Sequence, residues 1–180
     1  MKLPHSLNAL ALATFALIAA PSQAALTAGD SGALCSLTDT TMNATACSGS
    51  WDGNNKNQDA DVYAELFALS GVSGWAEQTP DLSGPGGTAG TLTFAPPVDS
   101  PFAIALKASN SFSLYYYSGA SGVTSIDYIT NGVSVNGRGM PQDLSHATLY
   151  LAPIPEPETY ALMLAGLGAV AFVARRRKVL

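Results

Sequence analysis

The chain has 180 residues, of which 47% are hydrophobic and only 12% are charged, and its formal net charge is −5. An average soluble domain has about 25% charged residues. The hydrophobic surplus lies mostly at the two ends of the chain, and four of the 8 basic side chains are consecutive near the C-terminal end. This distribution excludes a nucleic-acid-binding protein, a polytopic membrane protein and a multi-domain enzyme.

Residues 1–24 have the organisation of a secretory signal peptide, with a basic start, an apolar helix and a small-residue end. The apolar run over residues 9–20 is uncharged, and a proline follows it. Small residues before the bond between Ala24 and Ala25 predict cleavage there by signal peptidase, after export through the secretory translocon. An apolar helix of 12 residues spans about 18 Å, which is less than the roughly 30 Å of a bilayer core, so a permanent anchor is not expected.

Residues 153–178 combine three features in order. A proline-rich stretch is expected to be extended, because proline fixes its own φ and restricts the preceding residue. Residues 160–174 are uncharged and predict a short transmembrane helix, which would rise about 22 Å. A basic stop follows, made of Arg175, Arg176, Arg177 and Lys178. Because basic residues stay on the cytoplasmic side, the body of an exported chain would remain outside.

This order of features, with Pro155-Glu156-Pro157 at its start, resembles the PEP-CTERM sorting signal of Gram-negative bacteria. The resemblance implies that the tail holds the precursor transiently in the inner membrane. An exosortase, a membrane-embedded cysteine protease, would then cut near the Pro-Glu-Pro motif, and the product would reach the cell surface or the medium. The alternative is an ordinary single-pass anchor with a proline-rich stalk, because hydropathy alone does not separate the two.

Residues 25–152 are expected to form one exported domain. They contain three basic and eleven acidic side chains, a net charge of −8, which disfavours contact with nucleic acid. Short alternating segments separated by polar turns predict an all-β fold, an antiparallel β-sandwich of jelly-roll or Ig-like type. The expected strands are residues 91–94 (ending at Pro96 and Pro97), 102–107, 112–117, 124–129, 133–135 and 147–151, with a hairpin turn over 108–111. Residues 62–69 fit a strand or a short helix, and we expect a strand.

The two cysteines, Cys35 and Cys47, both lie in the exported part. A pair of cysteines in an oxidising compartment usually forms a disulfide. Closing a loop of this length would stabilise the fold by about 3 kcal/mol in the chain-entropy model.

Residues 51–61 are rich in Asp and Asn, which favour turns and can also bind Ca²⁺ through oxygen atoms. The spacing does not match an EF-hand, so we expect a loop, with calcium as the alternative. No cofactor or metal is otherwise predicted.

His146 is the single histidine that remains after signal-peptide removal, and it follows Asp143 and Ser145 closely. A Ser-His-Asp site requires three side chains brought together in space, and the chain has no Gly-x-Ser-x-Gly elbow. We therefore expect a protein that is not an enzyme.

Alternation in the strand over residues 112–117 places Tyr115 and Tyr117 on one face. If the opposite face is the core, these rings are exposed and could form a platform for sugar rings, extended by Trp51 or Trp75. Aromatic side chains also pair across strands simply to stabilise a sheet.

Three functions follow from these observations. The preferred one is a structural component of an extracellular matrix or biofilm, because PEP-CTERM proteins as a class are associated with exopolysaccharide matrix. The alternatives are a carbohydrate-binding module, with exopolysaccharide as the partner, and a single-pass, membrane-anchored periplasmic protein.

Overall fold

A computed structural model describes residues 26–29, 32–82, 86–99, 101–153, 162–170 and 175. The predicted signal peptide and its cleavage site, Ala24 and Ala25, lie outside these residues.

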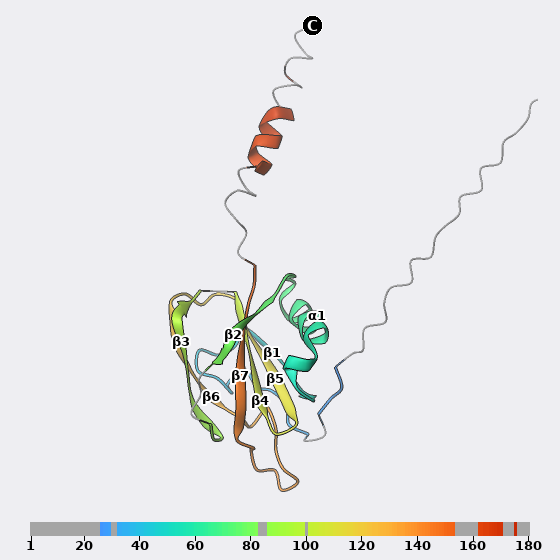
Figure 1. The fold of residues 1–180 in the computed structure, drawn as a ribbon, viewed down its shortest axis with the longest axis vertical. Helices are drawn as coiled ribbons and strands as arrows, with labels where there is room; N and C mark the ends of the chain where they lie inside the picture. Colours follow the sequence, from blue (N-terminus) through green and yellow to red (C-terminus); the bar gives the residue numbers. More distant parts are fainter. Residues whose placement is uncertain are drawn as a thin grey trace, which may run out of the picture.

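Two antiparallel sheets form the body of the domain (Figure 1). The larger sheet has, in spatial order, β1 (Ala46–Asp52), β5 (Ser111–Tyr117), β4 (Phe102–Ala108), β7 (Leu144–Leu151) and β2 (Ala76–Leu82). The smaller sheet pairs β3 (Ala89–Val98) with β6 (Val123–Ile129). This architecture agrees with the predicted all-β sandwich, to which it adds helical segments that were not predicted in the domain.

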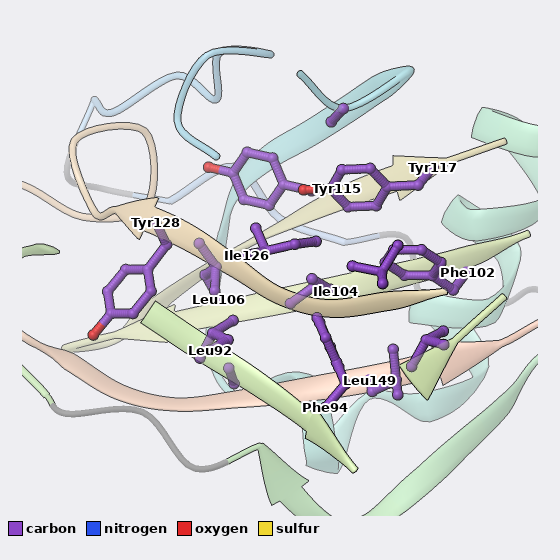
Figure 2. Close-up of a cluster of buried hydrophobic side chains, with 14 of the residues drawn as sticks. Leu92, Phe94, Phe102, Ile104, Leu106, Tyr115, Tyr117, Ile126, Tyr128 and Leu149 are labelled. Atoms are coloured by element: carbon purple, nitrogen blue, oxygen red, sulfur yellow. The ribbon is translucent and has the colours of Figure 1, made fainter. Parts of the chain in front are cut away.

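The main core lies between the two sheets (Figure 2). Leu92 and Phe94 of β3 and Ile126 of β6 pack against Ile104 and Leu106 of β4. Phe102 and Tyr117 stack with their ring centroids 4.7 Å apart and their planes 18° from parallel. The smaller sheet thus covers one face of the larger sheet.

A second core lies on the opposite face of the five-stranded sheet, beneath α1 (Asp59–Ser70). Val62 and Leu66 of the helix are fully buried, in a cluster that includes side chains of β4, β5 and β7. Because both faces are covered, every residue of β4 and β5 is buried. The short 3₁₀ helix η1 (Asn55–Asn57) leads into α1.

The expectation of a strand over residues 62–69 was wrong, because this segment lies within α1. Val62 and Leu66 are four residues apart and therefore share one face of a helix. Asp59 and Asp61 lie in the first turn, where the helix dipole favours negative charge. Gly71 ends the helix in the left-handed conformation with φ of 70°, and its N–H donates to the carbonyl of Phe67.

Two strand boundaries also differ from the prediction. β3 continues past Pro96 and Pro97 to Val98, which is possible because proline is tolerated in a strand with one unpaired edge. Residues 133–135 do not form a named strand, and Val135 makes an isolated bridge to Pro141 at the base of a turn. Strands β4 and β5 and their connecting turn are confirmed, with Ser109 and Asn110 as the turn residues.

Candidate functional site

The C-terminal tail leaves the domain from the end of β7, a strand that pairs with β4 on one side and β2 on the other. Beyond Leu151, the N–H of Ala152 donates to the carbonyl of Pro101 at 3.2 Å, and the Ala152 side chain is buried. Pro153 is exposed. The motif Pro155-Glu156-Pro157 lies outside the described residues.

Residues 162–170, which belong to the predicted transmembrane segment over 160–174, are helical and exposed. Arg175 is also helical, whereas Arg176, Arg177 and Lys178 lie outside the described residues. Within the described part of the chain, no helix has both the length and the apolar character needed to cross a membrane.

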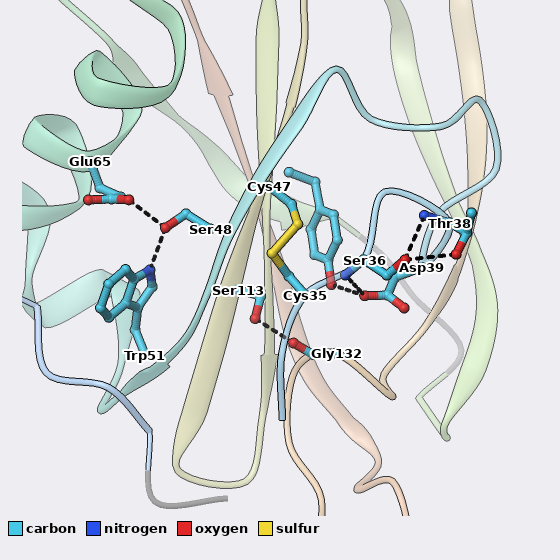
Figure 3. Close-up of a disulfide and its surroundings, with 11 residues drawn as sticks. Cys35, Ser36, Thr38, Asp39, Cys47, Ser48, Trp51, Glu65, Ser113 and Gly132 are labelled. Carbon is cyan, nitrogen blue, oxygen red and sulfur yellow. Dashed lines mark hydrogen bonds between the residues drawn. A yellow bond between two sulfur atoms is a disulfide. The ribbon is translucent and has the colours of Figure 1, made fainter. Parts of the chain in front are cut away.

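The predicted disulfide between Cys35 and Cys47 is present, with Cα atoms 6.1 Å apart (Figure 3). It joins the segment before β1 to β1 itself. In that segment, Oδ2 of Asp39 accepts hydrogen bonds from the N–H of Ser36 at 2.7 Å and from the hydroxyl of Tyr115 at 3.0 Å. The disulfide and this carboxylate together attach the segment to the larger sheet.

The predicted exposure of Tyr115 and Tyr117 was wrong, because both rings lie in the core between the sheets (Figure 2). The Tyr117 hydroxyl makes a hydrogen bond with Oγ1 of Thr40 at 2.6 Å. Burial raises the pKa of Tyr117 to about 12, and burial together with the Asp39 carboxylate raises the pKa of Tyr115 well above its usual value. These rings are structural and do not form a sugar platform.

The two tryptophans do not extend a surface platform either. Trp75 is buried beneath α1, where its ring meets that of Tyr116 edge to face at a centroid distance of 6.0 Å. Its indole N–H donates to the carbonyl of Val72 at 2.8 Å. Trp51 is half-buried and donates to Oγ of Ser48 at 3.2 Å, and Ser48 in turn donates to Glu65 of α1 (Figure 3).

His146 lies beside a buried asparagine. Nδ2 of Asn55 donates to Oγ1 of Thr148 at 3.1 Å and to the hydroxyl of Tyr150 at 3.0 Å. This orientation of the amide places Oδ1 of Asn55 3.1 Å from Nε2 of His146. Because an amide oxygen can only accept a hydrogen bond, the ring N–H of His146 donates to it. His146 therefore helps to hold η1 against β7.

The Asp- and Asn-rich stretch over residues 51–61 contributes mainly to local structure. Asn54 caps η1 by accepting the N–H of Lys56 at 3.2 Å, and Asn55 is fully buried. Asp59 and Asp61 begin α1. Among the residues that the structure describes, no cluster of three or more His, Cys, Asp or Glu side chains is placed to hold a metal ion.

Comparison with known families identifies the C-terminal segment. Residues 153–178 match the family model of the PEP-CTERM protein-sorting motif, which confirms the resemblance over the same residues. The motif supports an exosortase-processed, surface-sorted protein whose sorting signal anchors it to the membrane before processing. No curated protein and no solved structure matches the chain.

Sequence reasoning missed two residues that organise the domain, Asp39 and Asn55. Both are buried polar side chains, with 4% and 0% of their surface exposed. Asp39 lies between the two cysteines, and Asn55 lies within a stretch that reads as a solvated loop. Neither position carries a local signal for burial, because the partners that bury them are distant in the sequence.

Proposed function

We propose that this chain is an exported structural component of an extracellular matrix or biofilm and not an enzyme. It would be released from its C-terminal tail by an exosortase near Pro155-Glu156-Pro157. The observation that carries this proposal is the match of residues 153–178 to the PEP-CTERM sorting motif. Signal peptidase would act first, at the bond between Ala24 and Ala25.

The organisation of the domain supports a structural role. The aromatic rings of β5 are used in the two cores, and the hydroxyl of Tyr115 anchors the disulfide-bonded segment through Asp39. His146 has Asn55 as a structural partner. The side chains that suggested sugar binding or catalysis are thus engaged in holding the fold together.

Deletion of the gene, followed by complementation, tests this function. We expect deletion to change cell aggregation and wild-type complementation to restore it, with secreted hydrolase activities unchanged. A variant with Glu156→Ala and Pro157→Ala should keep its tail, remain in the inner membrane and fail to restore aggregation. Normal aggregation after deletion would contradict the matrix role. Normal processing of the variant would contradict the exosortase step and favour a different use of the tail.

A further inference from the structure

We propose that the end of the domain from which the chain leaves β7 docks directly against the exosortase during processing. We call this end the exit face and define it by residues 70–75, 99, 101 and 118–122. The inference rests on the proposed function, because it takes the exosortase to act at Pro155-Glu156-Pro157.

Strand register places these segments together. Leu151, at the end of β7, pairs with Ala76 at the start of β2 and with Phe102 at the start of β4. Phe102 also pairs with Tyr117 at the end of β5. The connections that precede β2 and β4 and follow β5 therefore lie at the end of the larger sheet where β7 ends (Figure 1).

The exit face touches the departing chain at the connection between α1 and β2. A Cβ atom on Gly74 would lie 3.3 Å from Cγ of Pro153, so the connection between α1 and β2 touches the exit. On the other side, Oδ1 of Asp99 accepts the hydroxyl of Ser121 at 2.9 Å and the N–H of Gly122 at 2.7 Å. These bonds fix the connection between β5 and β6 next to the start of β4.

The covalent tether leaves little room between the exit face and a protease. Ala152 is held by its backbone hydrogen bond to Pro101, and the motif begins three residues later at Pro155. Three residues span at most about 11 Å when fully extended. A protein that encloses the motif in a binding cleft must therefore lie against the exit face while the domain is folded.

The composition of the exit face suits such close approach. Its two longer connections both have the sequence Ser-Gly-x-Ser-Gly, at residues 70–74 and 118–122, and neither contains a charged residue. Asp99 is the one charged residue of the exit face, and its carboxylate is hydrogen-bonded to Ser121 and Gly122. The exported domain as a whole has a net charge of −8, so its acidic side chains lie mostly elsewhere. Small, neutral side chains allow the backbone to approach a partner without steric clash or loss of hydration of charges.

Two glycines provide a matched test. Gly119, on the exit face, has a φ outside the left-handed range and has no atom within 4 Å of an added Cβ. Gly137 has the same properties but lies in the turn closed by the bridge between Val135 and Pro141, before the start of β7, whereas the exit face is at the end of that strand. Tryptophan at either position should leave the fold intact, which equal thermal unfolding midpoints would verify.

The experiment is a pulse-chase of the full-length precursor in cells that contain their own exosortase, with loss of the tail followed by mass. We expect Gly119→Trp to slow processing about fivefold or more, as a steric clash that costs about 1 kcal/mol in the transition state would. Gly137→Trp should be processed at the wild-type rate. Inserting Gly-Ser-Gly-Ser after Pro153 should restore the rate of Gly119→Trp, because the longer tether separates the two bodies.

Equal processing of Gly119→Trp and the wild type would overturn the inference. Gly119→Lys and Gly119→Glu separate the enzyme from the membrane as the contacting surface. An enzyme contact predicts slower processing for both. Faster processing with Lys and slower processing with Glu would point to an anionic membrane surface and would also overturn it. Wild-type processing of the Glu156→Ala and Pro157→Ala variant would instead show that the proposed function itself has failed, and the inference with it.

Discussion

The hydroxyl of Tyr115 donates a hydrogen bond of 3.0 Å to Oδ2 of Asp39, a residue 76 positions earlier in the chain. Asp39 is buried and lies in the segment closed by the disulfide between Cys35 and Cys47. One inward-facing tyrosine of a central strand thus fixes the position of the segment that precedes β1. This bond gives the Tyr115 hydroxyl a partner in the core between the two sheets, where its ring is buried.

Tyr115→Phe should lower the free energy of unfolding by about 1–3 kcal/mol, because a buried carboxylate loses one of its donors. Urea denaturation of the exported domain measures the effect. Tyr116→Phe is the matched control, since Tyr116 is adjacent and its hydroxyl makes no hydrogen bond within the described part of the chain. The control should stay within about 0.5 kcal/mol of the wild type. Equal effects of the two substitutions would contradict the role of Asp39.

The domain should lose stability at alkaline pH. Burial raises the pKa of Tyr117 to about 12 in the folded state, above the value of about 10 in the unfolded chain. Because the pKa of this acid is higher in the folded state, the unfolded chain loses the proton at a lower pH than the folded protein does. The contribution of Tyr117 to the free energy of unfolding is therefore complete below about pH 10 and is lost as the pH rises from about 10 to 12. Tyr117 alone would contribute a loss of about 2–3 kcal/mol.

Urea midpoints measured between pH 8 and pH 12 test this dependence. Tyr117→Phe should have a lower urea midpoint than the wild type at pH 8. Its midpoint should decline less steeply above pH 10, because the hydroxyl with the raised pKa is absent. Parallel declines in the two proteins would show that Tyr117 does not contribute to the pH dependence.

Gly132→Ala should destabilise the domain by about 1–3 kcal/mol, as overpacking does in a tight core. A Cβ atom there would overlap Oδ2 of Asp39 and would lie 2.8 Å from the Cα atom of Cys35. Gly137→Ala is the control, because nothing lies within 4 Å of its added Cβ. Thermal unfolding of both variants compares them directly, and an unchanged midpoint for Gly132→Ala would refute this packing.

Asn55→Ala should lower the free energy of unfolding by about 2–3 kcal/mol, because it removes a buried amide that hydrogen-bonds the hydroxyls of Thr148 and Tyr150. Asn57→Ala, at an exposed position of the same 3₁₀ helix, should have little effect.

Urea denaturation in the presence of EDTA and of Ca²⁺ should give the same ranking of the two variants. A large effect of Ca²⁺ on the wild-type midpoint would instead favour the calcium alternative for residues 51–61.

The strands with the clearest signals could be predicted from the sequence. The hairpin of β4 and β5 has two apolar runs around a short polar turn, and the disulfide follows from a pair of cysteines in an exported chain. Strands β1 and β2 were missed, because they are rich in small and polar residues and contain little alternation.

Burial of Tyr115 and Tyr117 could not be predicted, because alternation separates the two faces of a strand but does not say what covers each face. β5 is covered by the smaller sheet on one side and by α1 on the other. Helix α1 could not be distinguished from a strand, because over a short segment its apolar residues fit both the helical repeat and the strand repeat. The sorting motif was found because its features are contiguous in the sequence.

Intact mass and sequencing of both termini of the native protein, from surface and culture-medium fractions, test the sorting claim most directly. Processing by signal peptidase and exosortase predicts a start at Ala25 and an end near Pro155, Glu156 or Pro157. A native protein that still carries the basic residues 175–178 would contradict exosortase processing and identify a membrane-anchored periplasmic domain.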